Sequence, residues 1–153
     1  RKIFAPIWIK GPIKEFTSAG IVIAGDAAGQ TKPTTAGGIF SCGMGGIIAG
    51  NTITKYLETN DISQLKQYQK SWQSKFGKEF EKQRISRKIL ERVNNKTIDN
   101  LFDTITPEIV DEISDKDDFD FHTTSIVKLL GIRKSLSAAQ NIMSSELRRL
   151  LTS

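Results

Sequence analysis

The stretch GIVIAGDAAGQTKPTTAGGIFSCGMGGIIAG, residues 20–50, decides how this chain folds. It holds nine of the 12 glycines, since only Gly11, Gly77 and Gly131 lie outside it. It opens with a short apolar run, continues as a loop around Asp26, and ends in a long uncharged run of small residues. Glycine in a helix lowers its stability by about 1 kcal/mol relative to alanine. A run so rich in glycine therefore indicates that another group must approach the backbone closely.

The two ends of this stretch predict different elements. Residues 20–25 form a short apolar run rich in β-branched residues, which predicts a strand buried on both faces of a parallel sheet. The uncharged run after the loop predicts a helix over 37–58, because it is too long for a strand. Upstream, residues 3–9 predict an extended segment that is an edge strand or irregular, because Pro6 has no N–H to give to a ladder.

The chain after residue 37 reads as helical. Apolar residues recur every three to five positions over 62–93, which predicts one amphipathic helix whose aromatic residues belong to the core. Asp61 is its expected N-cap, Gln64 completes a capping box, and Gly77 is a point where the helix bends or breaks. Shorter helices are predicted at 97–105, 107–114, 124–131 and 132–151, the second with Pro107 at its first position.

Charge is distributed unevenly along the chain. The net charge is +5 over 153 residues, a length typical of one domain. Residues 55–96 are mainly basic and residues 99–120 mainly acidic. We interpret the basic run as a solvated helix face, with contact to an anionic membrane surface as the alternative. The uncharged run 33–54, between Lys32 and Lys55, is long enough to span a bilayer, but its proline, threonines and glycines favour a helix buried in protein.

Known phosphate-binding loops do not fit the glycine-rich stretch. A P-loop starting at Gly25 needs its second glycine where Gln30 stands. A dinucleotide motif starting at Gly43 meets Ile48 where its last glycine is required. What remains is Asp26 at a strand end, where a carboxylate can accept a sugar or polyol hydroxyl. A helix is expected to start after it, and a helix start offers free N–H groups and the positive end of a dipole.

These residues resemble a known flavin-binding motif. The stretch is similar to the second flavin-contact motif of FAD enzymes built like p-hydroxybenzoate hydroxylase, and most of all to the geranylgeranyl reductase family, including the archaeal digeranylgeranylglycerophospholipid reductases. Their pattern is a hydrophobic strand, G-D-A-A-G, P-x-T-G-G-G-I and a small-residue helix. Residues 65–82, LKQYQKSWQSKFGKEFEK, resemble the helix that follows in that family. The resemblance is strong over 20–54, moderate to about residue 93 and weak beyond.

The resemblance implies FAD as the cofactor and assigns roles to particular residues. Asp26 would bind the ribitol hydroxyls, the loop from Pro33 would lie against the isoalloxazine edge, and the N–H groups that begin the helix would face the N1/O2 side of the flavin. Ala36 departs from the family, which often has glycine there, so the loop is expected to be less open. The residues expected to bind the cofactor are Gly25, Asp26, Pro33, Gly37, Gly38 and Ile39.

The same resemblance implies the fold class and the domain organisation. The parent protein is expected to be α/β, with a Rossmann-like FAD/NAD(P)-binding fold, and this chain to be mostly α-helical with one or two strands at its N-terminal end. Residues 1–58 would be the last segment of the FAD-binding domain and residues 59–153 a C-terminal helical region. A parallel strand needs neighbours that this chain lacks, so we expect the chain to be the C-terminal part of a larger protein.

The implied activity is that of an FAD-dependent oxidoreductase acting on CH–CH groups, which reduces the C=C bonds of geranylgeranyl chains in archaeal membrane lipid precursors. An isoprenoid lipid is the expected substrate, and the electron donor, NAD(P)H or ferredoxin, stays open. The expected location is cytoplasmic or peripheral at an anionic membrane. An FAD monooxygenase and a basic nucleic-acid-binding module remain as alternatives, although no nucleic acid is expected as a partner.

Other reactive side chains give no further site. The lone cysteine, Cys42, excludes an internal disulfide and is interpreted as a small core residue. No metal is expected, because His122 is the only histidine of the chain. No residue is assigned as catalytic.

Overall fold

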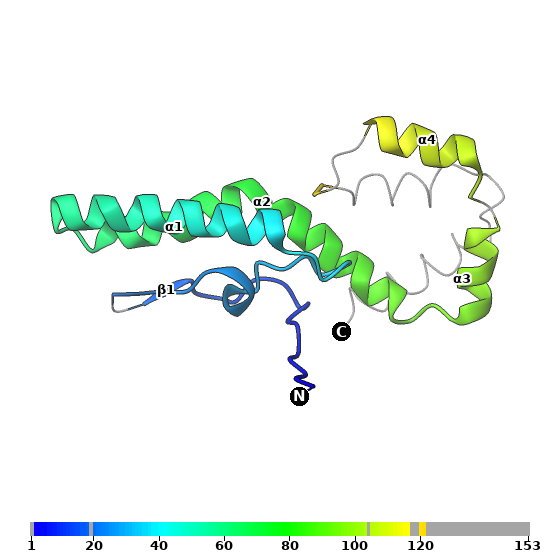
Figure 1. The fold of residues 1–153 in the computed structure, drawn as a ribbon, viewed down its shortest axis with the longest axis horizontal. Helices are drawn as coiled ribbons and strands as arrows, with labels where there is room; N and C mark the ends of the chain where they lie inside the picture. The colour runs from blue at the N-terminus through cyan, green and yellow to red at the C-terminus, as the bar shows by residue number, and fades with distance from the viewer. Residues whose placement is uncertain (1, 19, 104, 117–119, 122–153) are drawn as a thin grey trace, which may run out of the picture. The chain divides into compact units, whose positions relative to one another are not determined.

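The structure, a computed structural model, describes residues 2–18, 20–103, 105–116 and 120–121. The described part is mostly helical, with one short hairpin near its N-terminal end, which confirms the predicted fold class of this chain. It divides into two compact units, residues 1–87 and 88–153. The elements in chain order are β1 (Thr17–Ser18), β2 (Ile21–Val22), the 3-10 helix η1 (Gly25–Ala28), α1 (Ile39–Thr59), α2 (Ser63–Leu90), α3 (Asn95–Phe102) and α4 (Pro107–Lys116) (Figure 1).

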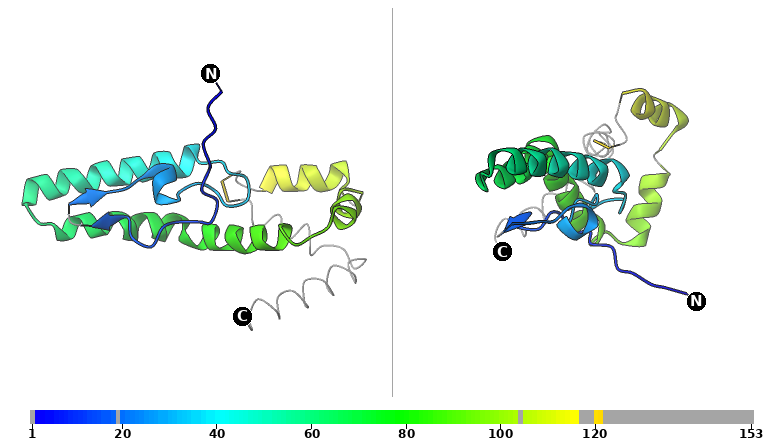
Figure 2. Two further views of the ribbon diagram at one scale, coloured as in Figure 1. Left: turned by 90° about the horizontal axis from the view of Figure 1, so that it is seen from below. Right: turned by 60° about the vertical axis from the view of Figure 1, so that its left-hand side comes forward.

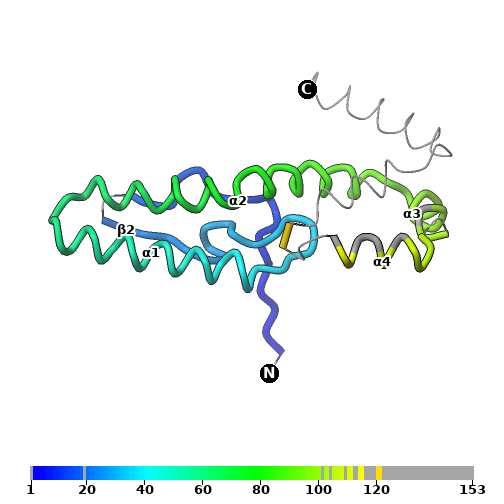
Figure 3. Tube along the Cα trace, turned by 90° about the horizontal axis from the view of Figure 1, so that it is seen from above, coloured from blue at the N-terminus to red at the C-terminus, as the bar shows by residue number. Residues whose placement is uncertain are grey.

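Helices α1 and α2 lie side by side and run in opposite directions (Figure 3). Asn60 ends α1 in the left-handed conformation, with φ of 52°, and its N–H donates to the carbonyl of Tyr56 at 2.7 Å. Asp61 then caps α2, as predicted, because the hydroxyl and N–H of Ser63 and the amide of Gln64 donate to its carboxylate. These hydrogen bonds lower the pKa of Asp61.

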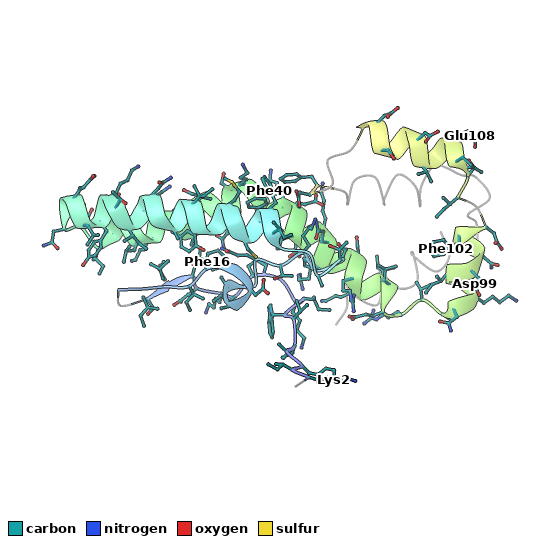
Figure 4. The ribbon with its side chains drawn as sticks, viewed as in Figure 1. Lys2, Phe16, Phe40, Asp99, Phe102 and Glu108 are labelled. Atoms are coloured by element: carbon teal, nitrogen blue, oxygen red, sulfur yellow. The ribbon has the colours of Figure 1, made fainter. Side chains whose placement is uncertain are left out.

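The apolar stripe of α2 forms the core of the first unit, and α2 continues through Gly77 without a break. Phe16, just before β1, is buried against it, with its ring centroid 5.5 Å from those of Tyr68 and Trp72 (Figure 4). The prediction that these aromatic residues are core is confirmed. The fully buried members of the column on α2 are Tyr68, Trp72, Phe76 and Phe80.

One side-chain amide and one backbone hydrogen bond hold the segment that precedes β1. Gln69 of α2 donates from Nε2 to the carbonyl of Lys14 at 2.9 Å and accepts the N–H of Phe16 on Oε1 at 2.9 Å. Further along, the N–H of Ile13 donates to the carbonyl of Ala28 at 3.1 Å. The segment before β1 is therefore fastened both to α2 and to η1.

The predicted buried parallel strand is wrong for the described residues. Only Ile21–Val22 is a strand, and it pairs antiparallel with Thr17–Ser18 across a tight turn. Ile21 is 60% exposed. A parallel partner requires a crossover of a dozen or more residues, whereas a hairpin forms locally from a short turn. Residues 3–9 carry no regular secondary structure, which agrees with the irregular alternative.

Helix α1 differs from the predicted buried helix because one of its faces is open. Ile39 is 98% exposed and Leu57 is 73% exposed. A Cβ added at Gly43, Gly46 or Gly50 would meet nothing within 4 Å, so no described contact requires glycine at these positions. None of the helices among the described residues has the length and hydropathy that crossing a membrane requires.

The second unit contains α3 and α4, which Figure 2 shows from two further directions. Pro107 is the first residue of α4, as predicted, and Glu108 places a carboxylate in its first turn. Both choices suit a helix start, because proline lacks the N–H that would go unpaired and the dipole favours negative charge there. The predicted helices at 124–131 and 132–151, and His122, lie outside the described residues.

The close approach of Gly29 to the N-terminal segment predicts a large loss of stability on substitution. Gly29 has φ of 67°, and a Cβ there would overlap the carbonyl oxygen of Gly11. We expect Gly29→Ala to lower the free energy of unfolding by about 3 kcal/mol or more, from backbone strain and collision together. Gly20→Ala is the matched control, with φ of 81° and open space, and should cost about 1–2 kcal/mol. Urea titration followed by circular dichroism measures both, and equal losses would contradict the prediction.

Candidate functional site

Asp26 lies in the turn formed by η1, shortly after β2. Gly25 and Gly29, on either side of it, have φ of 70° and 67°, in the left-handed region that favours glycine. The N–H of Gly29 donates to the carbonyl of Asp26 at 3.0 Å, and the N–H of Gln30 donates to the carbonyl of Gly25 at 3.2 Å. These two bonds fix the backbone around an exposed carboxylate.

The two oxygens of the Asp26 carboxylate have different surroundings. Oδ1 accepts the hydroxyl of Thr31 at 2.6 Å and the thiol of Cys42 at 3.4 Å. Oδ2 has no hydrogen-bond donor among the residues that the structure describes. The carboxylate is thus oriented through one oxygen and can accept a ligand hydroxyl with the other.

The start of α1 carries no side-chain cap. Its N-cap residue is Gly38, and among the residues that the structure describes no side-chain cap is bonded to the first turn. The N–H groups that open a helix have no partner within it, and they lie at the positive end of its dipole. The N–H of Gly37 is partly used, since it donates to the hydroxyl of Thr35 at 3.3 Å. Gly38 and Ile39 are therefore the better candidates to donate to a ligand.

The carboxylate and the helix start form one cradle. A Cβ on Gly38 would lie 3.5 Å from Oδ1 of Asp26, 3.5 Å from Oγ1 of Thr31 and 2.9 Å from Sγ of Cys42. Glycine at this position therefore keeps open the space in which an acceptor oxygen and the helix N–H groups meet. The structure places Gly38 beside Asp26, and the predicted residues Gly25, Gly37 and Ile39 are the chain neighbours of these two.

Pro33 takes a different place from the rest of the predicted set. Its side chain is fully buried, so the exposed atoms of this loop belong to Thr35 and Ala36. The loop is closed by two backbone bonds, from the N–H of Lys32 to the carbonyl of Gly37 at 2.8 Å and from the N–H of Ala36 to the carbonyl of Lys32 at 3.0 Å. A ligand edge could therefore contact Thr35 and Ala36, but not the buried ring of Pro33.

Sequence reasoning missed Gln30 and Thr31. Both are buried although they lie in a loop, where polar residues ordinarily face solvent. The hydroxyl of Thr31 holds the carboxylate of Asp26, and the side chain of Gln30 bonds the N–H of Gly25 at 2.8 Å. No periodicity marks a buried polar residue in a loop, so the sequence alone offered no signal for either role.

Cys42 lies closer to the site than the prediction of a small core residue implied. It is half-buried. Burial, the hydrogen bond to Asp26 and the charge of that carboxylate raise the pKa of the Cys42 thiol to about 11, while Thr31 and Ser41 act weakly in the opposite direction. The thiol is thus a neutral donor to Asp26 at ordinary pH, which does not favour a nucleophilic role.

The coupling between Cys42 and Asp26 predicts a pH-dependent reactivity. We expect alkylation of native Cys42 by iodoacetamide to rise with a midpoint near pH 11, because only the thiolate reacts. Asp26→Asn removes the carboxylate charge and should move the midpoint toward the ordinary thiol pKa of 9.0. The urea-unfolded chain, which should titrate near 9.0, is the reference. Identical native profiles for the wild type and Asp26→Asn would contradict the contact.

The left-handed conformation of Ala36 predicts a stabilising substitution. Ala36 has φ of 57°, which costs a residue with a Cβ about 1–2 kcal/mol. Ala36→Gly should raise the free energy of unfolding by about 0.5–1 kcal/mol after the larger backbone entropy of unfolded glycine is subtracted. Ala27→Gly, in η1 at another exposed position, is the control and should destabilise the chain. A loss of stability in Ala36→Gly in urea titrations would refute the assignment of strain.

Part of the chain is similar to named archaeal reductases. It is 41% identical to the digeranylgeranylglycerophospholipid reductase of Methanocaldococcus jannaschii over 69 residues, which are 44% of this chain and 18% of the relative. The digeranylgeranylglycerophospholipid reductase 2 of Methanopyrus kandleri is 38% identical over 68 residues, 43% of this chain and 17% of the relative. The digeranylgeranylglycerophospholipid reductase 1 of Methanococcoides burtonii is 35% identical over 68 residues, with the same two shares of 43% and 17%.

No protein-family profile and no solved structure matches the chain. The matched segment amounts to less than a fifth of the length of the curated relatives. Over that segment, the chain is homologous to the archaeal digeranylgeranylglycerophospholipid reductases.

Proposed function

We propose that residues 20–42 bind the flavin ring and the ribitol of FAD, in an FAD-dependent reductase that acts on the C=C bonds of geranylgeranyl lipid precursors. The observation that carries the proposal is the placement of the Asp26 carboxylate beside the uncapped start of α1. The similarity to the named reductases supports the same function and favours reduction over the monooxygenase alternative.

The site fits the chemistry of the flavin half of FAD. Asp26 is exposed, so its Oδ2 can accept a ribitol hydroxyl, and a carboxylate acceptor makes this a charge-assisted hydrogen bond. The N–H groups of Gly38 and Ile39 can donate to the electron-rich pyrimidine side of the ring, where the dipole of α1 favours negative charge. When bound, the flavin would supply hydride transfer. Thr31 and Cys42 orient the carboxylate in this scheme.

The chain supplies only part of such a site. It carries no motif for the pyrophosphate of a dinucleotide, so we propose that the ADP half of FAD is bound by other parts of the reductase fold. The lipid substrate also suggests a peripheral contact with an anionic membrane at a cytoplasmic face. Support for that contact comes from exposed lysines on α2, namely Lys66, Lys70, Lys78 and Lys82.

The proposal predicts how this chain responds to FAD in solution. We expect FAD to shift the backbone amide resonances of residues 25–42 in a nuclear magnetic resonance titration, with a Kd weaker than about 1 μM because the ADP half lacks contacts. Asp26→Ala should weaken binding at least about tenfold, the equivalent of one charge-assisted hydrogen bond. Asp103→Ala, at an exposed carboxylate after α3, should leave the affinity unchanged.

Two results of this titration would overturn the proposal. The first is the absence of shifts in residues 25–42 at millimolar FAD. The second is an equal response to ADP, which shares the adenosine diphosphate but lacks the ribitol and the ring, because the site would then recognise the wrong half of the cofactor.

A further inference from the structure

We propose that Gln30 is the positioning residue of the Asp26 turn. Its side-chain amide joins this turn to α2, so the position of α2 sets the position of the turn. The amide occupies a space that is open because residue 45 is glycine. The role of the turn in binding FAD rests on the proposed function. The positioning itself rests only on hydrogen bonds, burial and close approach within residues 1–87.

The side-chain amide of Gln30 is fully buried and joins two elements that are distant in sequence. Its Nε2 donates to the hydroxyl of Tyr68 on α2 at 2.7 Å, and its Oε1 accepts the N–H of Gly25 at 2.8 Å. Gly25 immediately precedes Asp26. A buried amide whose partner is removed loses a hydrogen bond that water cannot replace, so this arrangement is strongly preferred over its alternatives.

The backbone of Gln30 is held as firmly as its side chain. Its carbonyl accepts the hydroxyl of Ser41 at 2.6 Å, and the carbonyl of Ser41 in turn accepts Nε1 of Trp72 at 3.1 Å. One residue of the loop is thus tied to α1 and to two aromatic residues of α2. The turn that carries Asp26 is therefore tied to the helical hairpin, in addition to its backbone bond with the segment before β1.

Gly45 has a specific reason to be glycine. A Cβ at this position would overlap Oε1 of Gln30, the atom that holds the N–H of Gly25. At the next position along α1, a Cβ on Gly46 would meet nothing within 4 Å. The two glycines are adjacent and chemically identical, but only Gly45 is required by the path of the Gln30 side chain.

The chain contains its own reporter for the position of the turn. Cys42 is the only cysteine, and its thiol bonds the Asp26 carboxylate at 3.4 Å. The hydroxyls of Thr31 and Ser41 also face it, and Tyr68 lies near enough for the charge of Cys42 to contribute to the raised pKa of Tyr68. When the turn moves, the carboxylate leaves the thiol, and the alkylation rate of Cys42 rises without any need for a bound ligand.

The experiment measures iodoacetamide alkylation of native Cys42 at pH 8.5 in four variants of the full chain. Tyr68→Phe removes one hydroxyl, and Gly45→Ala displaces the amide; each should accelerate alkylation at least about threefold. Tyr56→Phe and Gly46→Ala are the matched controls and should alkylate at the wild-type rate. Because Tyr68→Phe keeps the buried ring, it decides the question even where Gly45→Ala does not fold.

A double variant separates positioning from general loosening of the structure. In Tyr68→Phe combined with Asp26→Asn, alkylation should be no faster than in Asp26→Asn alone, because both changes act through one carboxylate. A wild-type rate in Tyr68→Phe, a control as fast as the test variants, or multiplying effects in the double variant would each overturn the proposal. Failure of the wild-type chain to bind FAD would remove the proposed function and leave this result standing.

Discussion

The buried amide of Gln30 is the contact on which the rest of the described site depends. It bonds the turn before Asp26 on one side and the hydroxyl of Tyr68 on the other. The strands that would ordinarily hold such a turn have only two residues each, and their own pairing is local. The rigid support is therefore a helical hairpin with an aromatic core, to which a loop is fastened by polar contacts that cannot be exchanged with water.

In this arrangement, different parts of the sequence determine the stability of the first unit and the geometry of the site. The aromatic column of α2 supplies the largest fully buried side chains of the first unit, and Phe16 extends it toward the hairpin. The glycine-rich loop adds little apolar burial but supplies the carboxylate and the helix start. The expected division after residue 58 separates these roles, whereas the compact unit runs on to residue 87 and includes most of α2.

Much of this could be predicted from the sequence, and the reasons for the failures are physical. The two long helices, the cap at Asp61 and the aromatic core follow from periodicity and local capping chemistry. The site residues around Asp26 came from a motif, and their role stays a prediction; Gly38 lies beside Asp26, whereas Pro33 is buried. The parallel strand failed because an apolar run does not say which strand it pairs with. The role of Gln30 was not predicted, because its burial depends on contact with Tyr68 of α2, which lies 38 positions away in the sequence.

Because the start of α1 is uncapped, a molecule bound there would also complete the helix end. Ser, Thr, Asp and Asn are preferred at the N-cap because their side chains bond the first-turn N–H groups, but here the N-cap is Gly38, which has no side chain. Under the proposed function, an acceptor atom of a bound ligand at these N–H groups would serve as the missing cap. Occupancy of the site and order in the first turn of α1 would then be a single equilibrium, and the thermal stability of the chain would depend on ligand concentration.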